Sequence, residues 1–393
     1  MLPQTIKELT KQYAPVMLEI RRHLHAHPEL SFQEFKTSEY IGEQLKQWNI
    51  SFERVAGTGL VALLEGKKPS SRIIALRADI DALPITEENE VPYKSQNNGV
   101  MHACGHDVHT TCLLGATKIL NELRSEWQGA VKIIFQPGEE KNPGGASIMI
   151  KEGVLENPKP QAILAMHVHP GLPTGRLSFR GGLIMASADE IYITIKGKGG
   201  HAASPHLTAD TILIASQIVV SLQQVVSRNA NPFTPSVLSI CSFNGGFTTN
   251  VIPSEVKLMG TFRTMDETWR YKAHALIRKQ VVEIAEAMGA EAEVLIDVGY
   301  PAVYSNEAIT EKASMLAKEY FGAENIEETE IRMGAEDFGF YAQKIPACFY
   351  RVGVRNEHKG IVHNVHTPKF NVDEEALQNG AGIMAWLGMN LQP

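Results

Sequence analysis

The chain has 393 residues, of which 44% are hydrophobic and 21% are charged, so it has ample apolar surface for a folded core and no compositional sign of disorder. A formal net charge of -7 excludes the excess of clustered basic residues that marks nucleic-acid binding. The length predicts two or more domains, because a domain usually holds about 100–200 residues.

The composition also bears on location and partners. The most apolar stretch, TILIASQIVVSLQQVV, is interpreted as a buried helix, and no longer apolar run marks a membrane span. The first residues, MLPQTIKELTKQY, are polar and amphipathic, unlike a signal peptide. The four cysteines, Cys104, Cys112, Cys241 and Cys348, are too scattered for a disulfide framework. We therefore expect a cytoplasmic protein that acts on a small molecule and has no nucleic-acid or membrane partner.

The first predicted element is a helix over about the first 30 residues, which ends near Pro28 in HAHPELSFQE. Three short apolar runs follow, RIIALRADID at 72–81, AVKIIFQPGEE at 130–140 and AILAMHVHP at 162–170. Each run leads directly into acidic residues or histidines. This pattern predicts buried strands of an α/β sheet whose functional side chains gather at the carboxyl edge.

Between the first two runs, VHTTCLLGATKILNELRSEW has helical periodicity, so HACGHD lies in the loop that enters a helix. Asp107 is predicted to be the N-cap of that helix. The positive end of the helix would then lie near Cys104 and favour its thiolate form.

From residue 184 to residue 300 the predicted order is β-α-β-β-α-β, the split arrangement of ferredoxin-like domains. The chain then returns to a helix, a strand and a final helix. The sequence therefore predicts a catalytic domain of residues 1–183 and 301–393, in which helices flank a mixed, largely parallel sheet. A ferredoxin-like α+β domain of residues 184–300 is predicted to be inserted into it.

The loops after the predicted strands hold cysteine, histidine and glutamate, which are common metal ligands. Singly, each has an ordinary interpretation as a buried cysteine, a solvated turn or a structural histidine. The adjacent Glu139 and Glu140 allow a division of labour in which one carboxylate binds a cation and the other takes a proton from water. A parallel sheet would bring the loops to one edge, so the candidate ligands are Cys104, His106, Glu140, His167 and His366.

The chain contains, in this order, HACGHD, GEE, MHVHP, GKGGHAASPH, FNGGFTTNVIP, GTFRTM, GAEDFGFY and HNVHTPKF. With these motifs it resembles, over essentially its whole length, the metallopeptidase superfamily of aminoacylases and glutamate carboxypeptidases, peptidase family M20. More narrowly it resembles the amidohydrolase branch, which includes hippurate hydrolases, bacterial N-acyl-amino-acid deacylases and plant auxin-conjugate hydrolases.

The resemblance implies that the same five residues bind metal and that Glu139 is the general base. It implies that the inserted domain is a lid and dimerisation domain, in which His201 donates to the substrate's carbonyl oxygen, commonly at the partner subunit's site. It also implies that Asn250 and Arg263 hold the substrate's free carboxylate. Five ligands exceed the four of a closed structural zinc site, so we expect one or two divalent ions. Thiolate and imidazole favour zinc, with manganese or cobalt as alternatives.

One motif departs from the wider superfamily. The usual His-x-Asp is replaced here by Asp79-Ile80-Asp81. The resemblance to the amidohydrolase branch implies that the Cys104–His106 pair takes over the missing histidine's part. Either aspartate could orient a ligand or simply pair with Arg77. The roles of these two aspartates and of two further histidines are open at this point, namely Asp79, Asp81, His102 and His109.

The expected activity is metal-dependent hydrolysis of the amide bond of N-acyl-L-amino acids, with acetyl, benzoyl or longer acyl groups, by a homodimer or a higher homo-oligomer. Dipeptide hydrolysis by the same centre is the alternative. A cysteine hydrolase with Cys104 as nucleophile is the nearest chemical rival. A nucleotide-binding protein using GKGGHAAS is disfavoured because that stretch lacks the G-x-G-x-x-G spacing. A binding protein that kept only the fold would be expected to have lost ligands.

Overall fold

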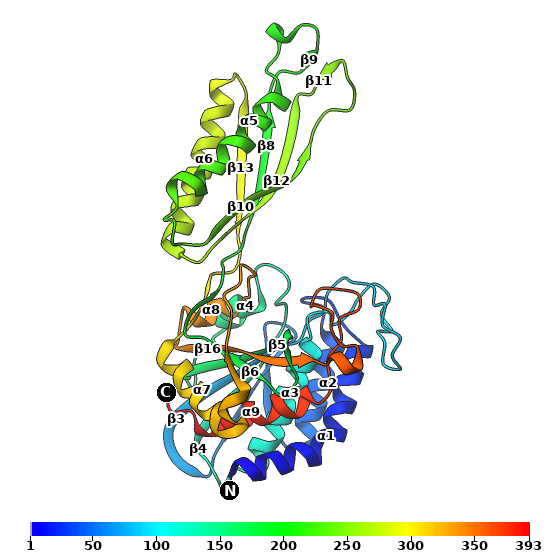
Figure 1. Cartoon of the computed structure of the whole chain (residues 1–393), viewed down its shortest axis with the longest axis vertical. Helices are drawn as coiled ribbons and strands as arrows, with labels where there is room; N and C mark the ends of the chain where they lie inside the picture. Colours follow the sequence, from blue (N-terminus) through cyan, green and yellow to red (C-terminus); the bar gives the residue numbers. More distant parts are fainter. Residues whose placement is uncertain (1) are drawn as a thin grey trace. The chain divides into compact units, whose positions relative to one another are not determined.

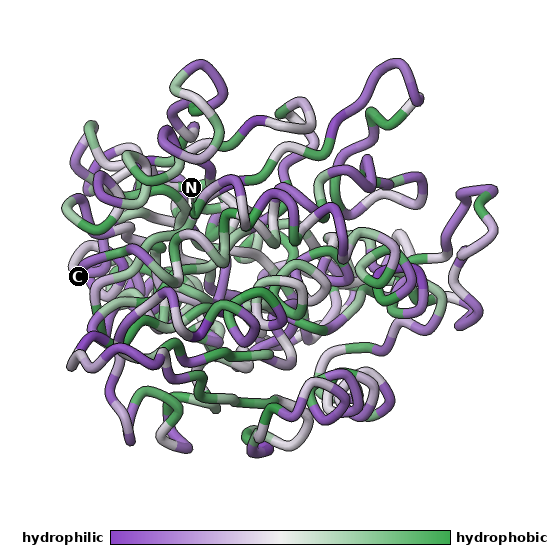
Figure 2. The backbone as a smooth tube through the Cα atoms, turned by 90° about the horizontal axis from the view of Figure 1, so that it is seen from below, coloured by the Kyte–Doolittle hydropathy of each residue, from purple (hydrophilic) through white to green (hydrophobic). Residues whose placement is uncertain are grey.

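The computed structural model describes residues 2–393, which divide into two compact units (Figure 1). Unit 1 comprises residues up to 184 together with 304–330 and 337–393, and unit 2 comprises residues 185–303 and 331–336. Figure 2 shows hydrophobic residues along many inner stretches of the backbone tube and hydrophilic residues on many of the outlying loops.

Unit 1 is built on an eight-stranded sheet with the order β1-β2-β4-β3-β5-β16-β6-β15. Its four central strands run parallel to one another, and the apolar runs predicted from the sequence form three of them. The prediction of a mixed, largely parallel sheet is therefore confirmed. The strands of this sheet are β1 (Phe52–Val55), β2 (Gly59–Glu65), β3 (Lys68–Asp79), β4 (Gln128–Gln136), β5 (Ala162–Pro173), β6 (Leu177–Phe179), β15 (Ile326–Glu328) and β16 (Ala347–Arg355).

The register of the central strands brings their polar ends to one edge. Asp79, the last residue of β3, pairs with Gln136, the last residue of β4. On the other side of β3, His167 of β5 pairs with Arg351 of β16. Because these strands are parallel, the loops that leave β3 and β4 lie next to His167, which is in the middle of β5 (Ala162–Pro173) and not at its end as the sequence predicted.

Helices pack against this sheet, and three of them, α1, α3 and α9, also pack against one another. Gly115 of α3 lies at their crossing, where an added Cβ would be 2.5 Å from Met17 Sδ and 2.9 Å from Ala381 Cβ. Only a residue without a side chain allows this approach. The helices of unit 1 are α1 (Leu2–Ala26), α2 (Phe35–Gln47), α3 (His106–Glu122), α4 (Gly145–Lys151), α7 (Glu307–Phe321), α8 (Gly339–Ala342) and α9 (Ala376–Asn390).

The start of α3 differs from the prediction for Asp107. The helix begins at His106, and its N-cap is Gly105 in the left-handed conformation, with φ of +84°. The carboxylate of Asp107 instead contacts Arg21 Nε at 3.0 Å and His25 Nδ1 at 2.8 Å. The N-cap prediction was wrong because two buried basic groups of α1 bind this carboxylate more favourably than backbone amides at a helix end would.

Unit 2 contains a four-stranded antiparallel sheet with the order β10-β12-β8-β13. In chain order its main elements run β-α-β-β-α-β, which is the split ferredoxin-like arrangement. A two-stranded ribbon of β9 and β11 extends from it. The elements are β8 (Asp189–Lys196), β9 (Gly200–His201), α5 (Thr211–Gln224), β10 (Ser236–Asn244), β11 (Val251–Ile252), β12 (Glu255–Thr264), α6 (Glu267–Ala287) and β13 (Glu291–Val298); β7 (Gly182–Met185) pairs with β14 (Val303–Ser305).

The apolar stretch that was interpreted as a buried helix forms α5 and a following turn of π-helix, Val225–Asn229. The helical segment Thr211–Asn229 is long and apolar enough to cross a membrane by length and composition alone. Only 33% of its most apolar stretch is buried inside the chain. One face packs in the core of unit 2 through Ile214 and Ile218, whereas Leu213 and Val220 are 57% and 65% exposed. The interpretation was therefore wrong for one face of this helix, which remains apolar and uncovered in the single chain.

Candidate metal centre

The five candidate ligands converge in unit 1 and form two overlapping groups. One ligand atom each from Cys104, His106 and His167 lies within 4.8 Å of the others, and the same holds for Cys104, Glu140 and His366. Cys104 belongs to both groups. A thiolate at that position could bridge two cations, each of which would also have imidazole ligands.

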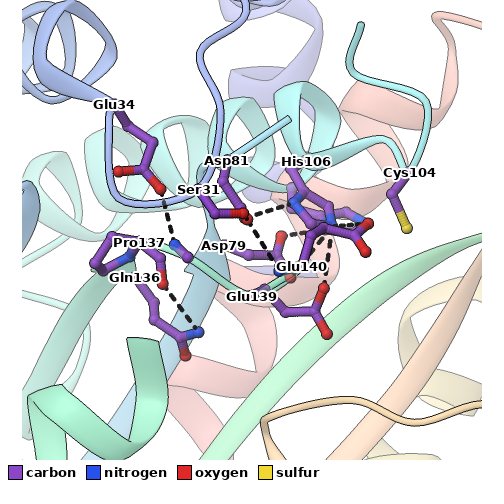
Figure 3. Close-up of polar contacts among 12 residues, drawn as sticks. Ser31, Glu34, Asp79, Asp81, Cys104, His106, Gln136, Pro137, Glu139 and Glu140 are labelled. Carbon is purple, nitrogen blue, oxygen red and sulfur yellow. Dashed lines mark hydrogen bonds and ion pairs between the residues drawn. The ribbon is translucent and has the colours of Figure 1, made fainter. Parts of the chain in front are cut away.

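His106 is oriented by Asp81. Its Nδ1 lies 3.1 Å from Asp81 Oδ1, so the ring donates there and Nε2 is the ring atom that faces the other candidate ligands (Figure 3). Within residues 2–393, Nε2 is buried and has no hydrogen-bond partner. Oxygens of Glu140 and Glu139 lie 3.9 Å and 4.0 Å from it. This nitrogen has the orientation and the neighbours of a metal ligand.

The field around His106 favours positive charge. Burial opposes a charge on its ring, but the carboxylates of Asp79 and Asp81 outweigh this effect and raise the pKa of His106 to about 10. A cation bound at Nε2 would interact with the same carboxylates in place of the proton. The charge balance of the site therefore fits a divalent metal ion.

His167 has the complementary properties of a neutral ligand. Its Nδ1 donates to the carbonyl oxygen of Val168 at 2.7 Å, which leaves a lone pair on Nε2, 3.4 Å from the sulfur of Cys104. Burial, with the nearby His109 and Arg351, holds the pKa of His167 well below its usual value. The ring is therefore neutral, as metal coordination requires.

Both ring nitrogens of His109 make hydrogen bonds to other residues of the chain. The backbone N–H of Val168 donates to its Nε2 at 2.9 Å, and its Nδ1 donates to Asp79 Oδ1 at 2.5 Å. Asp79 also accepts from Arg77 Nη1 at 2.7 Å. His109 therefore positions the part of β5 that carries His167, while Asp79 orients His109 and pairs with Arg77.

The loop Gln136–Glu140 presents the two adjacent glutamates. Asp81 Oδ2 accepts the backbone N–H of Glu140 at 3.0 Å, which ties this loop to the aspartate that orients His106. Glu140 Oε1 lies 3.2 Å from His366 Nε2. Glu139 is 6% exposed and points to the same space, as Figure 3 shows. The two carboxylates thus lie on the same side of the site as His106.

His366 reaches the site from the loop before α9. Its backbone has a φ of +61°, uncommon for a residue with a side chain, and its N–H donates to the carbonyl oxygen of Ala103 at 2.8 Å. The contact with Glu140 raises the pKa of His366. The hydrogen bond to Ala103 attaches this exposed histidine to the loop that carries Cys104.

His102 is buried but belongs to none of these ligand groups. Both its ring nitrogens lack a hydrogen-bond partner among residues 2–393, and burial lowers the pKa of His102 to about 4. It is therefore a neutral ring next to the site, and nothing in the structure gives it a chemical role.

The other three candidate residues lie in unit 2. His201 and Asn250 are neighbours on the β9–β11 ribbon, because Val251 pairs with His201 and Ala202 donates to the carbonyl of Asn250. His201 Nδ1 accepts the N–H of Ala203 at 3.0 Å, so Nε2 carries the proton and is a donor. Strand β12 begins at Glu255, shortly after the ribbon strand β11 that follows Asn250. Arg263 lies eight residues further along β12, or about 26 Å from Glu255 at the usual strand rise. The structure therefore separates Arg263 from Asn250 within one copy of unit 2.

Sequence reasoning missed two residues of the α1–α2 connection that contact this site. Ser31 Oγ donates to Asp81 Oδ2 at 2.7 Å, and Glu34 Oε1 accepts the N–H of Gly138 at 2.8 Å. The sequence pattern that could have pointed to Glu34 is its place at the N-cap of α2, where Ser, Thr, Asp or Asn is usual and a glutamate is not.

An α/β domain that gathers a cysteine, histidines and glutamates at the carboxyl edge of a largely parallel sheet is typical of a metal-dependent hydrolase. The sequence profile of peptidase family M20/M25/M40 matches residues 75–389, and the chain belongs to this family. The resemblance predicted from the motifs is confirmed, and the protein is a metallo-amidohydrolase of this family.

Individual relatives match most of the chain. It is 44% identical to an N-acyl-L-amino acid amidohydrolase of Geobacillus stearothermophilus over 76% of this chain and 80% of that one. It is 37% identical to thermostable carboxypeptidase 2 of Saccharolobus solfataricus over 99% and 98% of the two chains. The crystal structure of the Bacillus subtilis YXEP protein, described as a dinuclear metal-binding peptidase, matches with a TM-score of 0.82 and 35% identity over 96% and 98% of the chains.

Proposed function

We propose that the protein hydrolyses the amide bond of N-acyl-L-amino acids and releases a carboxylic acid and an amino acid. The observation that carries this proposal is the pair of ligand groups sharing Cys104, with Glu139 next to the ligand Glu140. The similarity to an N-acyl-L-amino acid amidohydrolase supports the substrate class. Dipeptide hydrolysis is the second candidate, favoured by the similarity to a carboxypeptidase.

The proposed ligands are Cys104, His106, Glu140, His167 and His366. The soft sulfur and three imidazoles favour zinc, and manganese or cobalt would also fit the mixed donor set. The shared cysteine favours two ions per subunit. Such ions would supply Lewis-acid chemistry, since a bound divalent ion lowers the pKa of its water ligand towards about 7 and polarises a carbonyl group.

Glu139 is the proposed general base. Its carboxylate is almost buried and lies 4.0 Å from His106 Nε2, so it faces the place where the attacking water must be. It takes a proton from that water and passes it to the nitrogen of the leaving amino acid. One carboxylate thus serves both halves of the reaction, and its neighbour Glu140 stays a ligand.

His201, Asn250 and Arg263 are proposed to bind the substrate across two subunits. The structure supports a donor role for His201, because the backbone of Ala203 fixes its proton on Nε2. Asn250 and Arg263 cannot hold one carboxylate within a single copy of unit 2, since roughly 26 Å of β12 separates Arg263 from the ribbon. We therefore assign the ribbon residues His201 and Asn250 to the partner subunit's site.

A homodimer is the assembly we propose, and unit 2 offers the surface for it. β10 is an edge strand, so one side of its backbone is unpaired within unit 2. On α5, which packs near β10, Leu213 and Val220 are exposed. A second copy could extend the sheet at β10 and cover this apolar face about a two-fold axis. We further propose that the protein acts in the cytoplasm.

The substrate class is tested with a hydrolysis panel on protein of measured metal content. The panel contains N-acetyl, N-benzoyl and long-chain N-acyl amino acids together with dipeptides, and Glu139→Gln is the control for contaminating activity. We expect release of free amino acid from at least one N-acyl class at a higher kcat/KM than from any dipeptide. Turnover of dipeptides alone would support the second candidate, and no turnover on the whole panel would contradict both.

The shared site is tested by mixing two inactive variants, Glu139→Gln and His201→Ala, after dissociating and reassociating the subunits. A hybrid dimer has one site with both residues intact, so random mixing should restore about a quarter of the wild-type activity. If His201 acts within its own subunit, every site in the mixture has one defect and no activity returns.

A further inference from the structure

The α1–α2 connection contributes a buried carboxylate that holds the loop carrying Glu139. Glu34 is fully buried, and its Oε1 accepts the backbone N–H of Gly138, the residue before Glu139, at 2.8 Å. Figure 3 shows this side chain pointing to the Gln136–Glu140 loop from the side away from Cys104. We propose that Glu34 is a positioning residue that fixes the Glu139 carboxylate for proton transfer, an inference that rests on the proposed role of Glu139 as base.

The hydrogen bonds of Glu34 link three separate segments. Its Oε1 also accepts the N–H of Phe32 at 2.8 Å, and its Oε2 accepts the hydroxyl of Thr58 at 2.7 Å. The carboxylate is thus shared by its own loop, the turn before β2 and the Glu139 loop. Because a buried carboxylate accepts all three donors, moving the Glu139 loop would leave a buried N–H without a partner.

Packing restricts the same loop. Gly138 has a φ of +58°, and a Cβ there would lie 2.3 Å from the Phe32 ring. The Gly138 carbonyl accepts the N–H of Gly145 at 3.0 Å, and a Cβ on Gly145 would lie 1.6 Å from the Pro137 oxygen. The loop therefore lies in close contact with Phe32 of the Glu34 segment on one side and with the start of α4 on the other.

The end of β4 supplies a fixed point for this arrangement. The Gln136 amide donates to Asp337 Oδ2 at 2.8 Å, and its oxygen accepts from Arg77 Nε at 2.9 Å. The backbone of Glu140 is bound to Asp81. Both ends of the loop are thus held by buried side chains, and Glu34 holds its middle, at the residue next to the base.

The test uses three full-length variants with their metal content measured. Glu34→Ala removes the acceptor. Glu34→Gln keeps one oxygen for both N–H groups, and its amide can donate to the Thr58 hydroxyl, so it should rescue function. The matched control is Glu29→Ala in the same connection, which removes the acceptor for the Thr37 N–H of α2 at 2.9 Å but does not contact the Glu139 loop.

We expect Glu34→Ala to lower kcat by about 10- to 100-fold with KM and bound metal nearly unchanged, because small displacements of a reacting group carry costs of this size. Hydrogen–deuterium exchange at the Gly138 amide should become faster in Glu34→Ala and stay slow in Glu34→Gln and Glu29→Ala. If Glu34→Ala does not fold, Glu34→Asp, whose side chain is one methylene shorter, carries the same prediction.

The inference is overturned if Glu34→Ala keeps the kcat of Glu29→Ala, or if its activity falls only in parallel with lost metal. Failure of the proposed role of Glu139 is recognised separately, because Glu139→Gln would then retain activity. Failure of the proposed function is recognised by the absence of turnover of the whole substrate panel by the wild type. The exchange measurement needs no substrate, so it tests the contact itself even if the reaction class is wrong.

Discussion

Replacing Asp81 with Asn should weaken metal binding by changing the tautomer of His106. The Asp81 carboxylate accepts three hydrogen bonds, from His106 Nδ1 at 3.1 Å, Ser31 Oγ at 2.7 Å and the Glu140 N–H at 3.0 Å. An amide has one oxygen, which can serve the two donors on the Oδ2 side. Its NH2 group then faces His106 Nδ1, which must become an acceptor and move its proton to Nε2, the proposed ligand atom.

The loss of metal affinity follows from the competition between this proton and the metal ion for His106 Nε2. A metal ion must displace the proton from Nε2 and leave two donors facing each other at Nδ1, and such losses around a ligand typically weaken binding by about 10- to 100-fold, or about 1.4–2.7 kcal/mol. Competition with a chelator of known affinity measures the metal Kd of Asp81→Asn. Ser31→Ala is the control, because it removes one bond to Asp81 and leaves the His106 contact intact. A metal Kd for Asp81→Asn equal to that of Ser31→Ala would refute this reasoning.

Three further predictions follow from the site and its supports. Glu139→Gln should lower kcat by about 10²- to 10⁴-fold with metal content unchanged, and near-normal turnover would remove Glu139 as the base. Burial and Arg21 oppose a charge on His25, but its hydrogen bonds to Asp107 and Glu87 outweigh them and raise the pKa of His25. The stabilisation from the charged ring is therefore complete below about pH 6.5 and is lost as the pH rises through the raised pKa. The free energy of unfolding in urea should depend less on pH above about 6.5 for His25→Gln than for the wild type, and an equal dependence would contradict the assignment. Gly138→Ala should lower the free energy of unfolding by about 1–3 kcal/mol. The loss should be larger than for Gly153→Ala, because both glycines have a positive φ but only a Cβ at position 138 would lie against Phe32. Thermal unfolding of the two variants measures this difference.

The strands and the candidate ligands could be predicted because their signals are local. Three apolar runs leading into polar residues predicted β3, β4 and β5, and the same positions hold Glu140 and His167 at the site. The shared position of Cys104 between two groups depends on how four loops meet, so the sequence could offer it only as an expectation.

The supporting residues could not be predicted for the same reason. Glu34 contacts a residue 104 positions away, and His109 contacts a backbone amide 59 positions away. Asp107 was misassigned as a helix cap because its partners, Arg21 and His25, lie on α1 far back in the chain. In each case a buried polar group takes the partner that tertiary packing supplies, which local sequence does not encode.

The most direct test of the metal centre is to measure hydrolysis of the best N-acyl amino acid substrate before metal removal, after it, and after zinc is added back. The same three samples are treated with a thiol-alkylating reagent. We predict that chelation abolishes activity and that zinc restores it. We also predict that Cys104 is alkylated only in the metal-free protein, because the proposed metal ligand is its thiolate. Full activity after complete metal removal, together with inactivation by alkylation, would contradict this account and identify Cys104 as a nucleophile.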